Sequence, residues 1–325
     1  EICACLVGSE MCIRDSMKTV AVTGAGGFIG RRLTRYLCQK GIRVLALDIP
    51  ACEDVCVSDG ANFKQLDLSD AEGLTKALAD ADADVCYHLA WAGVSTDIKN
   101  DIGMQMQNLS WLINVMTACR ESGCRKIIIP GSASEYAYCG EMITGKNTYS
   151  PGDAYAAVKA AGQVLAQWYA DNKELDLNWL LIGSVYGPGR NDNNILTYTI
   201  KALLNNEKTK FSKLEQMWDY IYIDDLIDAL YLVGNYGKPG AVYPVGSGIA
   251  IPLREYIEKI KNIIDPEAQL GIGLLPYKDG CKPDNSVLDI SALCNDTGFA
   301  PKVPFEMGIQ KTIQYFKKME NNNGT

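Results

Sequence analysis

The chain has 325 residues, of which 47% are apolar and 22% are charged, so it can bury the core of one large domain or two modest ones. Its net charge of −8 argues against a nucleic-acid partner, because phosphate-binding surfaces are basic. No apolar run approaches the roughly 18 residues that cross a bilayer, and we expect no membrane partner. The 12 cysteines form no Cys-x-x-Cys pair and His88 is the single histidine, which excludes ordinary Cys/His zinc sites. We therefore expect a cytoplasmic protein with reduced thiols and no metal.

Residues 1–16 differ from the rest of the chain, because Met17 and not Glu1 leads directly into the first predicted strand. The stretch lacks the basic start and the uninterrupted apolar run of a signal peptide. It resembles translated sequencing-adapter text. We therefore expect residues 1–16 to be a non-native or disordered leader.

A glycine-rich turn follows the first predicted strand, residues 19–22. Gly24, Gly27 and Gly30 form the pattern G-x-x-G-x-x-G before an amphipathic helix that we expect to open near Gly27. Missing side chains let the backbone approach a pyrophosphate, which the amides at a helix N-terminus then bind. The strand before the turn and the helix after it favour this interpretation over a glycine turn without a ligand.

The second predicted strand, residues 44–47, ends at Asp48. This acid follows the glycines by roughly 20 residues, where a carboxylate can accept hydrogen bonds from the adenosine ribose hydroxyls. It also repels a 2′-phosphate, and residues 49–54 contain no arginine or lysine that would bind one. The pattern favours NAD over NADP.

From Met17 to Gly183, short apolar strands alternate with amphipathic helices, which is typical of a parallel sheet wound with helices. Further strands are predicted at 62–66, 84–88, 126–130 and 179–182, and helices at 71–79, 104–122 and 154–172. Beyond Gly183 the alternation weakens. We expect an α/β fold with a Rossmann-type doubly wound parallel sheet over 17–183, a returning strand near 241–245, and a smaller substrate-binding lobe formed mainly by 184–325.

Tyr155 and Lys159 are four residues apart on one predicted helix and so share a face. A phenol with a pKa near 10 is a poor base at neutral pH, and a neighbouring ammonium makes it a usable acid/base. Alone, the pair would be interpreted as an exposed helix pair. Ser132, directly after the strand at 126–130, adds a hydroxyl that can hydrogen-bond a substrate oxygen. A loop-capping role is credible for Ser134 and less so for Ser132. His88 is interpreted as a packed strand-end residue.

In this order, the glycine turn, Asp48, Ser132 and the Tyr155/Lys159 pair resemble the extended short-chain dehydrogenase/reductase family. More narrowly, the chain is similar to its nucleotide-sugar epimerase/dehydratase/reductase group from Met17 to Lys318. The resemblance implies that Ser132, Tyr155 and Lys159 are catalytic. It also implies that Tyr155 and Lys159 contact the cofactor. The further NAD-binding positions that it implies are Phe28, Ile29, Asp67, Leu68, Leu89, Ala90 and Asn108.

The chain departs from this group at several positions. The 4,6-dehydratases place an Asp-Glu pair after the catalytic Ser/Thr, where Ala133 and Ser134 stand here, so dehydration of that type is disfavoured. Trp218 replaces an arginine that often binds the nucleotide diphosphate, and Ser184 replaces a substrate-contacting asparagine. Arg190 or Lys278 could substitute for the missing arginine, with a solvated surface charge as the alternative. The substrate-binding candidates are therefore Ser132, Ser134, Ser184, Arg190, Trp218 and Lys278.

These features together predict an NAD-dependent nucleotide-sugar epimerase, most simply a 4-epimerase that acts through a transient ketone. The alternatives are an NAD(P)H-dependent 4-ketoreductase that uses the same three residues once, and a non-catalytic dinucleotide-binding protein. The resemblance also predicts a homodimer that packs the helices at 104–122 and 154–172 against their copies. Both helices carry more apolar residues than one sheet-facing stripe requires, among them Leu112, Val158 and Trp168.

Overall fold

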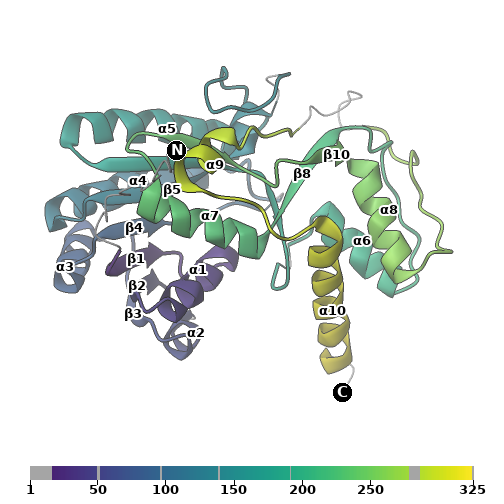
Figure 1. Cartoon of the computed structure of the whole chain (residues 1–325), viewed down its shortest axis with the longest axis horizontal. Coiled ribbons are helices and arrows are strands. Elements are labelled where there is room, and N and C mark those ends of the chain that lie inside the picture. The colour runs from purple at the N-terminus through teal and green to yellow at the C-terminus, as the bar shows by residue number, and fades with distance from the viewer. Residues whose placement is uncertain are drawn as a thin grey trace, which may run out of the picture.

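The computed structural model describes residues 17–49, 52–95, 97–137, 140–190, 192–277 and 286–323. The predicted leader at 1–16 and the candidate Lys278 lie outside these ranges. A seven-stranded parallel sheet forms the main body of the protein (Figure 1). Its strands lie in the spatial order β3 (Asn62–Gln65), β2 (Arg43–Asp48), β1 (Thr19–Thr23), β4 (Val85–His88), β5 (Lys126–Ser132), β6 (Asp176–Ile182) and β9 (Val242–Val245).

Helices cover both faces of this sheet (Figure 1). One face packs against α3 (Ala71–Ala81), α4 (Ile102–Ser122) and α5 (Ala154–Lys173), and the other against α1 (Phe28–Gln39) and α7 (Ile223–Tyr236). Every residue of β1 is buried, as expected for a strand covered on both sides. The predicted α/β fold with a Rossmann-type doubly wound parallel sheet is confirmed.

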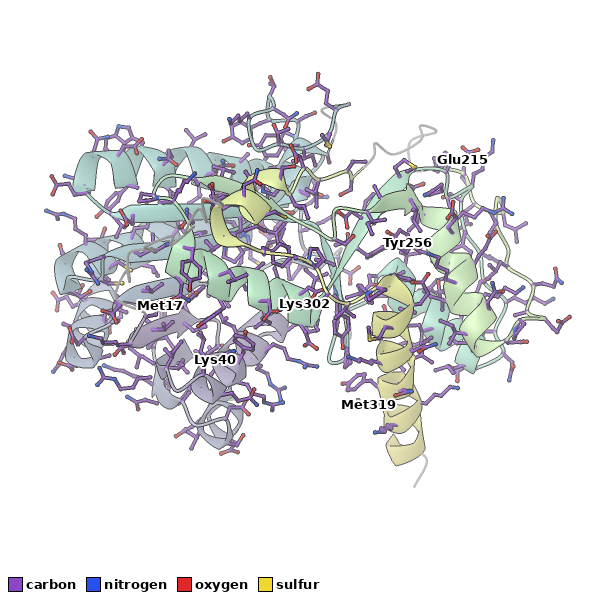
Figure 2. All side chains as sticks on the ribbon, viewed as in Figure 1. Met17, Lys40, Glu215, Tyr256, Lys302 and Met319 are labelled. Atoms are coloured by element: carbon purple, nitrogen blue, oxygen red, sulfur yellow. The ribbon has the colours of Figure 1, made fainter. Side chains whose placement is uncertain are left out.

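A smaller lobe is built around a three-stranded sheet, in the order β10 (Ala250–Pro252), β8 (Met217–Tyr222) and β7 (Ser184–Tyr186). It also contains α6 (Ile195–Leu204), α8 (Leu253–Ile264) and α10 (Phe305–Asn323). Tyr256, labelled in Figure 2, belongs to its aromatic core, with ring centroids 4.9 Å from Tyr220 and 4.6 Å from Phe305. Residues 184–325 do not all belong to the smaller lobe, because β9, α7 and α9 (Ser291–Thr297) pack on the main body.

β6 begins at Asp176, three residues before the strand expected at 179–182. The predicted strand was too short because the polar residue Asn178 interrupts the apolar run. Asn178 is fully buried, and its Nδ2 donates to the carbonyl of Lys238 at 2.6 Å. A pattern of apolar residues cannot show that a buried asparagine continues a strand while its Nδ2 donates to the backbone. α2 (Glu53–Ser58) is also a short helix that the sequence did not predict.

The carboxyl ends of the parallel strands all lie at one edge of the main sheet, which is where ligands bind in open α/β folds. β1 ends at Thr23, β4 at His88 and β5 at Ser132. Ser132 leads directly into a 3₁₀ turn, η2 (Ala133–Tyr136). Within the described residues, no helix has both the length and the apolar character needed to span a membrane.

Candidate active site

The glycine turn forms a backbone cradle between β1 and α1. Gly24 has a φ of +69°, and a Cβ there would come within 2.7 Å of the Ala90 amide nitrogen. A Cβ on Gly30 would overlap the Gly24 carbonyl oxygen. Gly27 is the N-cap of α1 and provides no side-chain cap, so the first helical amides are not covered by a side chain. Only glycines allow this close packing, and the cradle fits a diphosphate at a helix N-terminus.

Asp48 lies directly beside this cradle at the end of β2. Its Oδ2 accepts a hydrogen bond from the Gly26 amide at 2.7 Å, and its Oδ1 accepts one from the Ile49 amide at 2.8 Å. The carboxylate is half-buried, as a group that binds ribose hydroxyls requires. Cys52, which the sequence analysis missed, packs so closely on Gly26 that a Cβ there would overlap its Sγ.

The other cofactor candidates surround the same edge of the sheet. Phe28 and Ile29 are half-buried in the first turn of α1, and exposed Asp67 and half-buried Leu68 follow β3 beside β2. Leu89 and Ala90 continue β4 past the glycine turn, where the Ala90 amide donates to the Thr23 hydroxyl at 3.4 Å. The structure thus places these residues at one edge of the sheet, with Leu89 and Ala90 directly against Gly24.

Asn108, another cofactor candidate, is buried beside the loop that follows β4. It is 1% exposed, and its side chain exchanges two hydrogen bonds with the backbone of Ala92, at 2.8 and 3.1 Å. It therefore fixes the loop that follows β4. His88 is likewise a packed residue, with its Nδ1 2.8 Å from the Thr23 hydroxyl. Burial and nearby Lys159 lower the pKa of His88 to about 3, so the ring is neutral at pH 7.

Ser132 and Tyr155 meet where β5 and α5 approach each other. The Ser132 Oγ is 2.7 Å from the Ser134 Oγ and accepts a hydrogen bond from the Ser134 amide. Ser132 is therefore the cap of η2, the role that the sequence analysis considered more credible for Ser134. Burial raises the pKa of Tyr155 to about 12, and a hydrogen bond with Ser132 offsets part of this effect.

Lys159, whose ammonium we expect to favour the Tyr155 phenolate, is itself buried. Burial lowers the pKa of Lys159 itself to about 7, so the ammonium is only partly charged at neutral pH. Its Nζ donates to the Pro130 carbonyl at 2.6 Å and lies 6.0 Å from the Tyr155 ring centroid. The groups around Lys159 therefore influence how much of it is charged.

A cavity of about 140 Å³ opens beside Ser132, between the main sheet and the smaller lobe's β8. Its wall is formed by Ser132, Ala133, Ser134, Ala137, Ile143, Ile182, Gly183, Ser184, Trp218 and Ser286. The Trp218 Nε1 donates to the Ser184 Oγ at 2.8 Å, so these two unusual residues form one contact. The structure therefore places four of the six substrate-binding candidates on one wall.

Arg190 is not among the residues that line this cavity. Its guanidinium forms a bidentate ion pair with Asp192, at 2.6 and 2.8 Å, and also donates to the Val185 carbonyl. Its charge is thus compensated within its own loop, which leaves less of it available for a substrate anion. Lys278, the other candidate, lies outside the described residues.

A second, more open cavity of about 350 Å³ adjoins the N-terminus of α6 in the smaller lobe. It is lined by Asn193, Asn194, Ile195, Tyr198, Lys210, Phe211, Ser212, Leu214, Leu275 and Pro276. The sequence analysis assigned no site here, although Asn193 and Asn194 in front of an apolar run are a recognisable helix start.

Comparison with known proteins identifies the family. The model of the NAD dependent epimerase/dehydratase family matches residues 20–246. The chain belongs to this family. Its cofactor is accordingly NAD, which the glycine cradle and Asp48 fit. Among the described residues, no three histidine, cysteine, aspartate or glutamate side chains cluster as a metal site would require.

Family members with several activities are similar to this chain along nearly its whole length. The UDP-glucose 4-epimerase of Mycolicibacterium smegmatis is 29% identical over 321 residues, which cover 93% of this chain and 99% of the relative. Protein CapI of Staphylococcus aureus is 26% identical over 92% of this chain and 99% of its own length. The structure of the Thermus thermophilus UDP-glucose 4-epimerase complex with NAD has a TM-score of 0.79 at 26% identity, covering 92% of this chain and 99% of that chain.

Besides Cys52, the sequence analysis missed two residues near the catalytic candidates. Trp91 follows β4 and lies against both Lys159 and Tyr155. Glu135 is fully buried behind Ser132. Glu135 had a signal in the sequence, because Ser132 and Glu135 have the S-x-x-E spacing of a capping box, which the structure contains. The sequence contained no signal for Trp91 beyond its place after a predicted strand.

The position of Asp48 makes a prediction about cofactor preference. Asp48→Ala should weaken NAD binding by about tenfold or more and raise the ratio of NADP to NAD affinity, because a charged acceptor and a repulsive charge both disappear. Isothermal titration with the two cofactors measures this. Glu53→Ala is the control, since it removes a nearby charge and keeps the Asp48 hydrogen bonds. A wild-type protein that prefers NADP would show that Asp48 has another role.

Proposed function

We propose that this family member is a nucleotide-sugar 4-epimerase. The observation that supports this most is the position of Ser132, which lines a cavity of about 140 Å³ at the carboxyl edge of the main sheet and hydrogen-bonds Tyr155. A sugar ring in that cavity would place a hydroxyl against Ser132, the hydrogen-bond partner of Tyr155. The family, NAD and the epimerases among the relatives agree with this assignment.

In this mechanism Tyr155 and Ser132 act on one substrate oxygen. The Tyr155 phenolate accepts the proton of the C4 hydroxyl, while the Ser132 hydroxyl hydrogen-bonds the same oxygen and orients it. NAD⁺, which the glycine cradle and Asp48 would hold, would supply a reversible acceptor for the C4 hydride. Tyr155 then donates the proton back. Because burial holds the Tyr155 pKa near 12 in the chain alone, a charged Lys159 is needed to make the phenolate accessible.

The larger cavity is the proposed site of the nucleotide. The positive end of the α6 dipole and the Lys210 side chain lie at its wall, and both favour a diphosphate. Tyr198, Phe211 and Leu214 add apolar surface on which a base can pack. The first cavity would then hold the sugar, since Ser184 and Trp218 belong to the same lobe.

A ketoreductase is the second candidate. GDP-L-colitose synthase of Yersinia pseudotuberculosis is 24% identical over 94% of this chain, so relatives that are not named epimerases are also similar to it. The serine, tyrosine and lysine would serve a single reduction equally well. A non-catalytic dinucleotide-binding protein would need no such proton relay, and the contact between Ser132 and Tyr155 argues against it. A cytoplasmic location remains a prediction.

Cofactor retention separates the first two candidates. We expect NAD to remain with the purified protein through gel filtration and the protein to interconvert C4-epimeric nucleotide sugars without added cofactor. The test applies a panel of UDP-, dTDP- and GDP-sugars and detects the products by anion-exchange chromatography. A protein that consumes free NAD(P)H, or is inactive until it is added, would instead be a ketoreductase.

The proposed homodimer leads to a prediction about α5. Val164 and Trp168 on this helix are 56% and 58% exposed, whereas Leu112 on α4 and Val158 on α5 are buried in the chain itself. The first pair therefore forms the apolar surface left for a partner. We expect light scattering to give about twice the 35.5 kDa chain mass and Trp168→Arg to give the monomer. Ile249→Arg, at a residue 65% exposed elsewhere, is the control. A wild-type monomer would exclude the dimer.

A further inference from the structure

The side-chain ammonium of Lys159 is buried away from solvent. The residue is 4% exposed, and the one carbonyl to which its Nζ donates in the described structure is that of Pro130, at 2.6 Å. Burial disfavours the charged form of a lysine, and it lowers the pKa here to about 7. Any group that stabilises the ammonium therefore decides how much of the protein carries the charge at neutral pH.

Trp91 provides one such group. The Lys159 Nζ lies 3.5 Å from the centroid of its indole ring, within the range of a cation–π interaction. The indole is held in place, because its Nε1 donates to Gln105 Oε1 at 3.0 Å and Gln105 Nε2 donates to the Gly93 carbonyl at 2.7 Å. The same ring meets Tyr155 edge-on, with centroids 6.4 Å apart and planes at 86°. Trp91 thus contacts both members of the Tyr-Lys pair.

Glu135 provides the second group. It is fully buried, and its Oε1 accepts hydrogen bonds from the Ser132 amide at 2.6 Å and from Trp179 Nε1 at 3.3 Å. Its Oε2 is buried without a hydrogen-bond partner. Burial raises the pKa of Glu135, while the Ser132 amide and the charge of Lys159 lower it. The carboxyl and the ammonium therefore favour each other's charged forms across the site.

We propose that Trp91 and Glu135 are positioning residues that keep Lys159 charged, one with the face of its ring and the other with its carboxylate. Their contribution to catalysis rests on the proposed function, whereas their effect on Lys159 does not. Glu135 also fixes the backbone of Ser132, so it links the serine and the lysine of the site.

The other titratable groups around the pair do not replace these two. His88 on β4 is neutral, because burial lowers its pKa to about 3. Tyr155 on α5 has a raised pKa and is uncharged at pH 7, as are the phenols of Tyr136 and Tyr149, which face Glu135 and whose pKa values burial also raises. Glu135 is the one anion that favours the charge on Lys159 among the described residues.

The test measures the Lys159 charge directly in the full-length protein saturated with NAD⁺. Lysine labelled with ¹³C at Cε is titrated by NMR, and the Lys159 signal is assigned by its loss in Lys159→Arg. We expect Trp91→Leu to lower its titration midpoint by about 0.5–1 pH unit, and Trp91→Phe, which keeps an aromatic face, to lower it less. Glu135→Gln should lower the midpoint as well, and Glu135→Asp should restore part of it.

Unchanged midpoints in Trp91→Leu and Glu135→Gln would overturn the proposal. If Glu135→Gln does not fold, the comparison of Trp91→Leu with Trp91→Phe decides, with equal midpoints counting against the ring. The activity profile provides a separate check, because the loss of epimerisation at high pH should move to lower pH with the midpoint. A shifted midpoint in a protein without epimerase activity would refute the proposed function and leave the inference about Lys159 standing.

Discussion

Tyr155→Phe is expected to lower the turnover of the nucleotide-sugar substrate by about 10²–10⁴-fold, the range for loss of a positioned acid/base. The substitution removes the phenolic oxygen that the mechanism needs twice, once to accept the proton and once to return it. The ring itself remains, and with it the edge-on contact with Trp91 at 6.4 Å between centroids. The melting temperature and the affinity for NAD should therefore stay close to those of the wild type.

Steady-state kinetics with the active nucleotide sugar measure this effect, with circular dichroism and NAD titration as checks on folding and cofactor binding. Tyr149→Phe is the matched control, since Tyr149 is a partly buried phenol that stacks on Tyr136 with ring centroids 5.0 Å apart. Wild-type turnover in Tyr155→Phe would remove this residue from the mechanism.

Gly24→Ala is expected to abolish tight NAD binding, with a loss of affinity of about tenfold or more. Gly24 has a φ of +69°, and an added Cβ would come within 2.7 Å of the Ala90 nitrogen and 2.8 Å of its Cα. These are backbone atoms at the end of β4, which cannot turn away as a side chain can. The turn or the strand end must move, and the cradle for the diphosphate moves with it.

Gly41→Ala separates this steric effect from the cost of the backbone conformation. Gly41 has a φ of +76°, yet a Cβ there would meet nothing within 4 Å. Both variants should lose about 1–2 kcal/mol of stability from the left-handed conformation, and only Gly24→Ala should lose the cofactor. Fluorescence titration with NADH measures the affinity. Equal NAD affinity in the two variants would show that the turn does not hold the diphosphate.

The fold and the cofactor edge were predicted well because their signals are local. The central strand β1 is a short, fully buried run, and Gly24 and Gly30 have no room for a Cβ. Asp48 stands at the end of a strand, and its place beside Gly26 follows from the parallel pairing of β1 and β2. Spacing along the chain is enough to find such features.

The substrate side depends on contacts between distant segments, which spacing does not reveal. The Trp218–Ser184 hydrogen bond joins β8 to β7, and its two residues were named singly but not as a pair. Arg190 was a candidate because of its charge, yet Asp192, two residues on, binds that charge in a bidentate pair. A sequence shows both residues without showing that one compensates the other.

The electrostatics of the catalytic residues were the least predictable part. The spacing of Tyr155 and Lys159 predicts a shared face, but the pKa of each depends on how deeply the helix is buried. Burial opposes the charge on both, a consequence of the loop with Trp91 and the turn with Glu135 closing over α5. A role for Trp91 and Glu135 could be inferred only from the structure, which places them near Lys159.

The central claim is a transient oxidation at C4 in which the hydride leaves and returns within one active site. The most direct measurement follows a nucleotide sugar that carries deuterium at C4, incubated with the purified protein in water without added cofactor. We predict that the epimeric product keeps the deuterium at C4, as seen by mass spectrometry and NMR. Product that has exchanged this deuterium for solvent hydrogen, or that forms only when NAD(P)H is supplied, would contradict the account.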